Sequence, residues 1–266
     1  MEKNEKYEIM KYRKLDIKFY KDPLKLTSQQ LSLYRIRAKR DIGEKVKQGD
    51  IGGYISSENN LSINGESWIF DDAIVLGDAI VKGHAIVSGN AVIAGESKVS
   101  GNASISGSVL LPDKARVYGN AKISDSAIIS GKARVFDNAE ISGMSYVGNN
   151  SRVYGKAKIL DKAYILDNAT ISGNAQIFDD AFVYDGAKIF GNAKVYENGA
   201  VGGKVEIYGN AEVLGDVLVN ALEEIYGSSK ISKRTGIIIE TSKQIKDRKE
   251  VTNTVVSWLY DFIKYI

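Results

Sequence analysis

Cysteine is absent from this chain of 266 residues. This absence excludes a disulfide framework, a thiolate nucleophile and a cysteine-ligated metal. Long apolar runs are absent too, because no stretch approaches the roughly 20 apolar residues of a membrane-spanning helix, and residues 1–15 lack the apolar core of a signal peptide. We therefore expect a cytoplasmic protein with no membrane partner. The net charge of +3 is too small to indicate nucleic acid by itself, so an anion-binding argument must rest on where the charges lie.

What the sequence does contain is a repeat of six residues. Every sixth residue from Ile63 to Val219 is Ile, Val or Leu, with no insertion. Four residues after each aliphatic residue comes a small one, usually Ala. Two residues after each aliphatic residue comes, in nearly every hexad, Gly or Asp, often followed by Asn. Gly, Asn and Asp tolerate the positive φ angles of tight turns. Each hexad is therefore predicted to form a very short strand and a corner.

A period of six matches neither the 3.6 of a helix nor the alternation of a two-faced sheet. The predicted fold is all-β, a parallel β-helix solenoid. Three strands and three corners, about 18 residues, would form one coil that stacks on the next at roughly 4.8 Å. The aliphatic and the small residue would both point inward, where each aliphatic side chain contributes about 1.5–3 kcal/mol.

The pattern aliphatic–x–Gly–Asn–Ala–x, as in residues 117–122, resembles the hexapeptide-repeat family over residues 63–219. This resemblance implies a single-stranded, left-handed β-helix, a hand that the period alone does not give. The segments Leu33–Ala38 and Gly49–Ile55 are similar to a leader that precedes Gly-Asn-Ala repeats in a poorly characterised bacterial and prophage branch. That branch is acyltransferase-like by fold, which is an analogy and not an activity.

The chain is expected to comprise an N-terminal capping segment (1–60), the β-helix (61–240) and a C-terminal amphipathic helix (241–266). A cap is expected because the bare end of a β-helix exposes unpaired backbone groups. Within it we expect short strands around Tyr7–Tyr20 and Leu33–Arg37.

The sequence also predicts a turn at Gly52-Gly53 and an aliphatic register that continues through Ile225, Ile231 and Ile237. The C-terminal helix, whose apolar residues recur at helical spacing, either caps or lies along the rod, or it trimerises or docks a partner.

Acyltransferases of the resembled family use a catalytic histidine, and the single histidine of this chain is His84. It occupies the corner position that Asn or Asp holds elsewhere, so a turn residue at positive φ is the alternative interpretation. The family's acyltransferases also need a loop excursion, for which the unbroken register leaves no place. Its carbonic anhydrase branch needs three histidine ligands. We therefore expect no metal and no cofactor, and we favour a non-catalytic protein over an acyltransferase.

Residues that flank each aliphatic residue should point outward, and the same face returns every third hexad. One face would carry a basic column before the aliphatic positions and an aromatic column after them. Its candidate binding residues are Lys98, Arg116, Tyr118, Arg134, Phe136, Arg152, Tyr154, Lys188 and Phe190. Cations about 4.8 Å apart repel by roughly 0.9 kcal/mol even in bulk water. The column therefore calls for anions, either corner carboxylates such as Asp137 and Asp161 or a bound partner.

Interleaved Arg and aromatic side chains are typical of surfaces that bind single-stranded nucleic acid or nucleotides. The structural alternative is a stack of rings that stabilises the sheet, with Arg packed over the rings. Both interpretations stay open at this point.

A second face, from Ile74 to Leu218, is too apolar to remain exposed to solvent over its whole length. A terminal segment or another subunit would cover it, and trimers, common in the resembled family, suit a closed symmetric assembly. The third face is expected to be solvated apart from aromatic residues such as Trp68. We thus expect a homo-oligomeric binding or scaffold protein. Its partner would be a protein or an anionic ligand, and the prophage resemblance implies a host or defence component.

Overall fold

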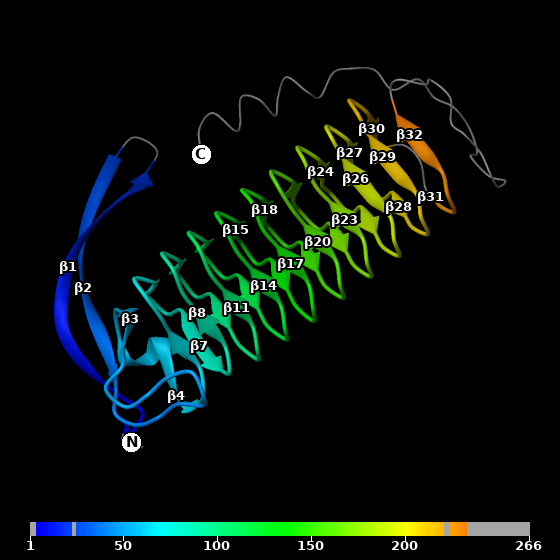
Figure 1. Ribbon diagram of the computed structural model, residues 1–266. Helices are drawn as coiled ribbons and strands as arrows, with labels where there is room; N and C mark the ends of the chain where they lie inside the picture. The colour runs from blue at the N-terminus through cyan, green and yellow to red at the C-terminus, as the bar shows by residue number, and fades with distance from the viewer. Residues whose placement is uncertain (1–3, 23–24, 221–223, 233–266) are drawn as a thin grey trace.

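The computed structural model describes residues 4–22, 25–220 and 224–232 and, within these, the side chains outside residues 11–31. Stacked coils form a rod, and a long hairpin lies at its N-terminal end (Figure 1). The fold is all-β, a three-sided parallel β-helix. The predicted fold class is therefore confirmed.

Each coil contributes one strand to each of three sheets, which form the three faces of the rod. The sheet that we call the apolar face contains β1 (Tyr7–Asp22), β2 (Lys25–Ala38), β3 (Ile51–Ile55), β6 (Ile74–Val75), β9 (Val92–Ile93), β12 (Leu110–Leu111), β15 (Ile128–Ile129), β18 (Tyr146–Val147), β21 (Tyr164–Ile165), β24 (Phe182–Val183), β27 (Ala200–Val201) and β30 (Leu218–Val219). The basic face contains β4 (Leu61–Gly65), β7 (Ile80–Gly83), β10 (Lys98–Val99), β13 (Arg116–Val117), β16 (Arg134–Val135), β19 (Arg152–Val153), β22 (Thr170–Ile171), β25 (Lys188–Ile189), β28 (Glu206–Ile207) and β31 (Glu224–Ile225). The mixed face contains β5 (Trp68–Ile69), β8 (Ile86–Val87), β11 (Ser104–Ile105), β14 (Lys122–Ile123), β17 (Glu140–Ile141), β20 (Lys158–Ile159), β23 (Gln176–Ile177), β26 (Lys194–Tyr196), β29 (Glu212–Leu214) and β32 (Lys230–Ser232). A single 3-10 turn, η1 (Glu58–Asn60), is the only helical element of the described residues.

The interior of the rod is lined by the aliphatic and small residues of the repeat. Val117 pairs with Val135 one coil further on, and both side chains are buried. Ala121 and Ala133, at the small position of their hexads, are buried as well. The repeat thus gives one continuous apolar core, because each coil buries its aliphatic side chains against the coils before and after it.

The corners use two residue positions in different ways. The Gly or Asp two residues after the aliphatic takes the positive φ angle, as at Gly119 (φ 71) and Asp137 (φ 57). The Asn that follows does not; its side chain instead forms a hydrogen bond with the Asn one coil away, as from Asn102 to Asn120 at 3.0 Å. His84 is not at positive φ either. The sequence predicted that the Asn of this position, or His84 in its place, adopts a positive φ angle. That prediction is wrong.

The first coil departs from the predicted register. Val81 pairs with Leu61 and not with Ile63, because a bulge lies between Leu61 and Gly65 in β4. Leu61 is buried, whereas Ile63 is only half-buried. The unbroken repeat therefore begins at Ile69, one hexad later than the sequence predicted.

Gly52 and Gly53 do not form the predicted turn, since they lie inside strand β3. Their role is close packing: a Cβ at Gly52 would come within 2.6 Å of the carbonyl oxygen of Ile69, and one at Gly53 within 2.5 Å of that of Ala73. The two glycines let the first strand of the rod lie directly against the next coil.

The N-terminal cap is a long antiparallel hairpin, β1 with β2, and not two short strands. Strand β2 pairs with β3, so the hairpin extends the apolar sheet beyond the first coil. Trp68, expected on the outside of the mixed face, is only 1% exposed, because the Tyr7 ring packs edge-on against it at 6.5 Å. The cap thus covers a side chain that the repeat alone would leave in water.

At the other end the register continues as predicted through Ile225 and Ile231, which pair with Ile207 and Val213. Ile237 and the helix expected over residues 241–266 lie outside the described residues. In the described part of the chain, no helix is long and apolar enough to cross a membrane.

Candidate anion-binding site

The basic column stands on four consecutive strands of the basic face. Lys98 pairs with Arg116, Arg116 with Arg134, and Arg134 with Arg152, each one coil apart. All four side chains are exposed, because the residue before each inward aliphatic points outward. The face sorting made from the sequence therefore holds for these residues.

No ion pair involves these four cations among the residues that the structure describes. The corner carboxylates proposed as their partners point elsewhere: Asp137 accepts from the backbone N–H of Gly155 at 3.3 Å, and Asp161 accepts from that of Asp179 at 3.2 Å. Of the two alternatives that the sequence left open, neutralisation by Asp137 and Asp161 is therefore not the one that the structure shows. These carboxylates satisfy backbone donors of the next coil instead.

Lys188, the last cation predicted for the site, differs from the others. Its Nζ lies 2.7 Å from Oε1 of Glu206, one coil further on, and this hydrogen bond raises the pKa of Lys188. Thr170 separates Lys188 from Arg152 in the column. The column thus consists of a segment without ion pairs, Lys98 to Arg152, and an end at Lys188 where Glu206 neutralises the charge.

The mixed face shows the contrasting arrangement. There Glu140 lies between Lys122 and Lys158 in register, and Lys158 binds Glu140 at 2.8 Å. This ion pair lowers the pKa of Glu140. Charges of opposite sign alternate along that face, so they neutralise one another without a ligand.

The aromatic column is a stack of parallel rings. The ring centroids of Tyr118 and Phe136 lie 4.9 Å apart, and those of Phe136 and Tyr154 lie 4.8 Å apart, with planes within a few degrees of parallel. Phe190 stacks on Tyr208 in the same way at 4.9 Å. The prediction of ring stacking along this face is confirmed.

The Arg side chains of the column are not packed over these rings. The described residues contain one cation–π contact, Arg35 over Tyr54 at 4.7 Å, and it lies at the cap. Because each inner ring is covered by its neighbours, the bases of a nucleic acid could stack only where the ring stack ends. Ser100 precedes Tyr118 in the column and Ser172 follows Tyr154, so both positions are such ends.

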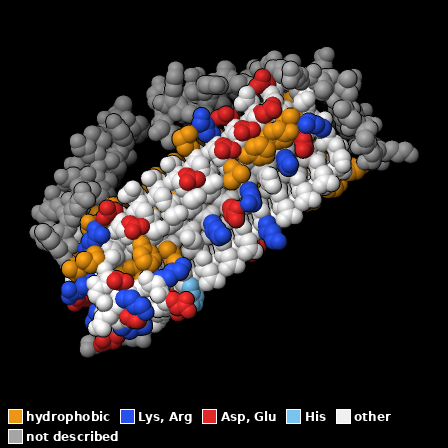
Figure 2. Space-filling view, viewed as in Figure 1, with side chains coloured by type: hydrophobic (Ala, Val, Ile, Leu, Met, Phe, Trp, Pro, Cys, Tyr) orange, Lys and Arg blue, Asp and Glu red, His pale blue; other side chains and the backbone are white. Residues whose placement is uncertain are grey.

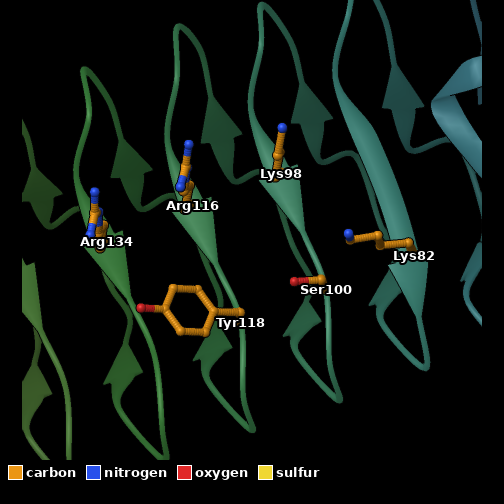
Figure 3. Close-up of a pocket in the computed structure, with 6 residues that line it drawn as sticks. All are labelled: Lys82, Lys98, Ser100, Arg116, Tyr118 and Arg134. Atoms are coloured by element: carbon orange, nitrogen blue, oxygen red, sulfur yellow. The ribbon is translucent and has the colours of Figure 1, made fainter.

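A surface pocket of ≈ 320 Å³ lies at the first of these ends. It is lined by Lys82, Lys98, Ser100, Arg116, Tyr118 and Arg134. Figure 3 shows the Tyr118 ring broadside and extending away from Ser100, while the Lys82 side chain extends toward Ser100 from the opposite side. The pocket thus joins part of the basic column to the open end of the ring stack. Phe136, Arg152, Tyr154, Lys188 and Phe190 do not line it.

Lys82 was missed from the sequence. It precedes Ser100 by one coil and therefore belongs to the aromatic column, where a cation was not sought. Extending that column backward by one coil from Ser100 would have found it.

His84 lies apart from the pocket, at a corner near the cap. Its side chain is 58% exposed, and its Nδ1 lies 3.4 Å from Oε2 of Glu66. Figure 2 shows the histidine, in pale blue, next to acidic side chains at this end of the rod. Within the described part of the chain, no group of His, Cys, Asp and Glu side chains is arranged to hold a metal ion.

Residues 115–131 match the family model of the YdcK β-solenoid repeat. Among solved structures, the chain is similar to LpxA from Acinetobacter baumannii, with 12% sequence identity and a TM-score of 0.49, over 64% of this chain and 71% of that chain. No curated protein matches the chain. The repeat match covers about one coil, and neither similarity assigns an activity to this chain.

Proposed function

We propose that this β-helix is a non-catalytic binding protein that holds an anionic ligand on its basic face. The observation that supports the proposal is the column Lys98, Arg116, Arg134 and Arg152, in which four cations stand one coil apart and form no ion pair among the described residues. Like charges held directly opposite on paired strands destabilise a sheet. A bound anion would remove this repulsion.

A phosphate-bearing ligand fits the column best. Arg presents a planar fork of donors that matches phosphate oxygens, and three of the four cations are Arg. A nucleic-acid strand would have to bind chiefly through its phosphates, because the inner rings of the aromatic column cover one another. The ligand would thus be recognised mainly by charge, and its affinity would fall with salt.

Inorganic tripolyphosphate tests the proposal, because it carries phosphate charge and no ring. Calorimetric titration of the full chain should show binding that weakens as salt is raised, and the triple variant R116A/R134A/R152A should lose it. The matched control is K122A/K158A/K194A, which removes the same charge from the mixed face and should leave binding unchanged. Binding that survives the arginine replacement, or that both variants lose equally, would refute the proposal.

We also propose that the protein is a homo-oligomer, with a trimer favoured, assembled through the apolar face. Aliphatic and aromatic side chains point outward from this face over successive coils, and Leu110 is 37% exposed there. An apolar stripe of this kind favours a closed assembly. Light scattering on the purified chain gives the mass in solution, and a monomer would contradict the proposal. A host or defence component as partner remains a prediction from the prophage resemblance.

Acyl transfer is the alternative function, and it depends on His84. The observation in its favour is the neighbouring Glu66 carboxylate, which could orient the imidazole ring of a general base. Turnover of an acyl-CoA that His84→Ala abolishes would establish it. Absence of turnover over a broad panel of acyl-CoA thioesters would dismiss it.

A further inference from the structure

The Ser100 step is a gap of one ring in the aromatic column. Residues 82, 100, 118 and 136 follow one another at intervals of one coil. The Tyr118 and Phe136 rings are parallel and 4.9 Å apart, so the ring spacing equals the coil spacing. Ser100 carries no ring, and one face of Tyr118 is therefore left without a stacking neighbour from the column.

Lys82 closes the other side of this gap. It stands one coil before Ser100, its side chain is exposed, and it extends toward Ser100 (Figure 3). A planar ring placed over Ser100 would have the Tyr118 ring on one face and the Lys82 ammonium on the other. Stacking and cation–π attraction would both act on that ring.

The cations beside the gap lie where the charged part of such a ligand would fall. Lys98 is two residues before Ser100 on the same outer face, and Arg116 stands in the same relation to Tyr118. Two residues of a strand span about 6.6 Å. Lys98, Arg116 and Arg134 line the same pocket as Ser100 and Tyr118.

We infer that this pocket is a site for one aromatic ring that carries phosphate groups, as in a nucleoside polyphosphate. The ring lies over Ser100 between Tyr118 and Lys82, and the phosphates lie against Lys98, Arg116 and Arg134. The inference rests on the proposed anion binding and adds the class of ligand. It also limits the site to one ring, whereas a strand of bases would need an open stacking face at each step.

The second end of the ring stack, at Ser172, offers a useful comparison. That step also lacks a ring, between Tyr154 and Phe190. However, the residue beside it in the basic column is Thr170, and Lys188 is bound to Glu206. The Ser172 step therefore has one unpaired cation beside it, Arg152, whereas Lys82, Lys98 and Arg116 all stand around Ser100.

Two probes and two matched variants test the inference on the full chain by calorimetric titration, without added divalent metal. ATP should bind about 5- to 150-fold more tightly than tripolyphosphate, because stacking of one base adds to the same charge contacts. Ser100→Tyr fills the gap with a ring of the column's own type and should reduce the affinity for ATP to that for tripolyphosphate. Ser172→Tyr adds the same ring at the other end of the stack and should change neither affinity.

Tyr118→Leu provides a second test that does not depend on filling the gap, and it should also remove the preference for ATP. Circular dichroism and thermal unfolding would verify that each variant is folded. Equal affinities of the unaltered chain for ATP and tripolyphosphate would overturn the ring site and leave the anion proposal standing. Loss of the ATP preference in Ser172→Tyr but not in Ser100→Tyr would also overturn it. If neither probe bound, both proposals would fail.

Discussion

The Nδ2 atom of Asn120 donates a hydrogen bond to Oδ1 of Asn138 at 3.1 Å, one coil further along the rod. Asn120 also accepts one, at 3.0 Å, from Asn102 on the preceding coil. The same corner position is Lys156 on the coil after Asn138, and the ladder resumes from Asn174 through Asn192. Asn120 and Asn192 thus each link three coils, since one side chain offers both a donor and an acceptor.

Replacement of Asn120 by Ala should therefore break two links of this ladder. Both bonds are exposed, so we expect a loss of about 0.5–1 kcal/mol in the free energy of unfolding. Lys132→Ala is the matched control, because Lys132 occupies the same corner position in another column, where the neighbouring coils hold no Asn-to-Asn bond to it. Thermal unfolding of the two variants measures the difference, and equal stabilities would show that the ladder adds nothing.

Asp125 combines a positive φ angle of 61 with a carboxylate that accepts from the backbone N–H of Gly143 at 2.9 Å. Asp125→Gly loses the hydrogen bond but relieves the left-handed backbone, whereas Asp125→Ala loses the bond and keeps the Cβ in that conformation. We therefore expect the Ala variant to be less stable than the Gly variant by about 1 kcal/mol. Urea unfolding of the pair provides the measurement, and an Ala variant at least as stable as the Gly variant would contradict this account.

The rod itself could be predicted from the sequence because its contacts repeat. Val99 meets Val117 for the same reason that Val117 meets Val135, so one period gives the whole register. The errors fall where a segment outside the repeat makes the contact. Trp68 is buried by Tyr7, and Leu61 replaces Ile63 where the cap joins the first coil. No pattern of six residues contains that information.

The candidate site could be predicted in part. The columns of Arg and aromatic residues follow from spacing alone, and so would the pairing of Lys188 with Glu206, which occupy successive places in one column. The direction of the Asp137 carboxylate could not be predicted, because the carboxylate can meet either a nearby cation or a backbone N–H. The backbone N–H of Gly155 is the partner that the structure shows.

The contact between the cap and the first coil gives a local test. The Tyr7 hydroxyl lies 3.0 Å from the carbonyl oxygen of Glu58 and 3.1 Å from that of Leu61. Tyr7→Phe removes the donor and leaves these carbonyls without it, at an expected cost of about 1 kcal/mol. Because a solenoid's coils interact only with their neighbours, hydrogen exchange should quicken around residues 55–69 and stay unchanged near residue 140. A uniform change along the rod would rule out this local role.

Lys6 provides a prediction about pH, because the residue is buried, with 1% exposure. Its Nζ donates to the carbonyl oxygen of Ser62 at 2.8 Å and to Oγ of Ser67 at 3.3 Å. Burial, with the charge of Arg40 as a smaller cause, lowers the pKa of Lys6 to about 8. Between this pKa and the usual value of 10.5, the unfolded chain binds more protons than the folded chain, so stability should rise with pH in this window.

The variant Lys6→Met isolates this effect, because it keeps the length of the side chain and removes the titrating group. The difference in unfolding temperature, unaltered chain minus variant, should be constant below about pH 8 and then increase toward pH 10. Tyr7, whose pKa burial raises to about 12, acts in the opposite direction above pH 10, but it is present in both proteins and cancels in the difference. A difference that stays flat from pH 7 to 10 would mean that the Lys6 amine keeps its ordinary pKa in the folded protein. A difference that falls over this range would mean that the folded state holds the Lys6 proton more tightly than water does.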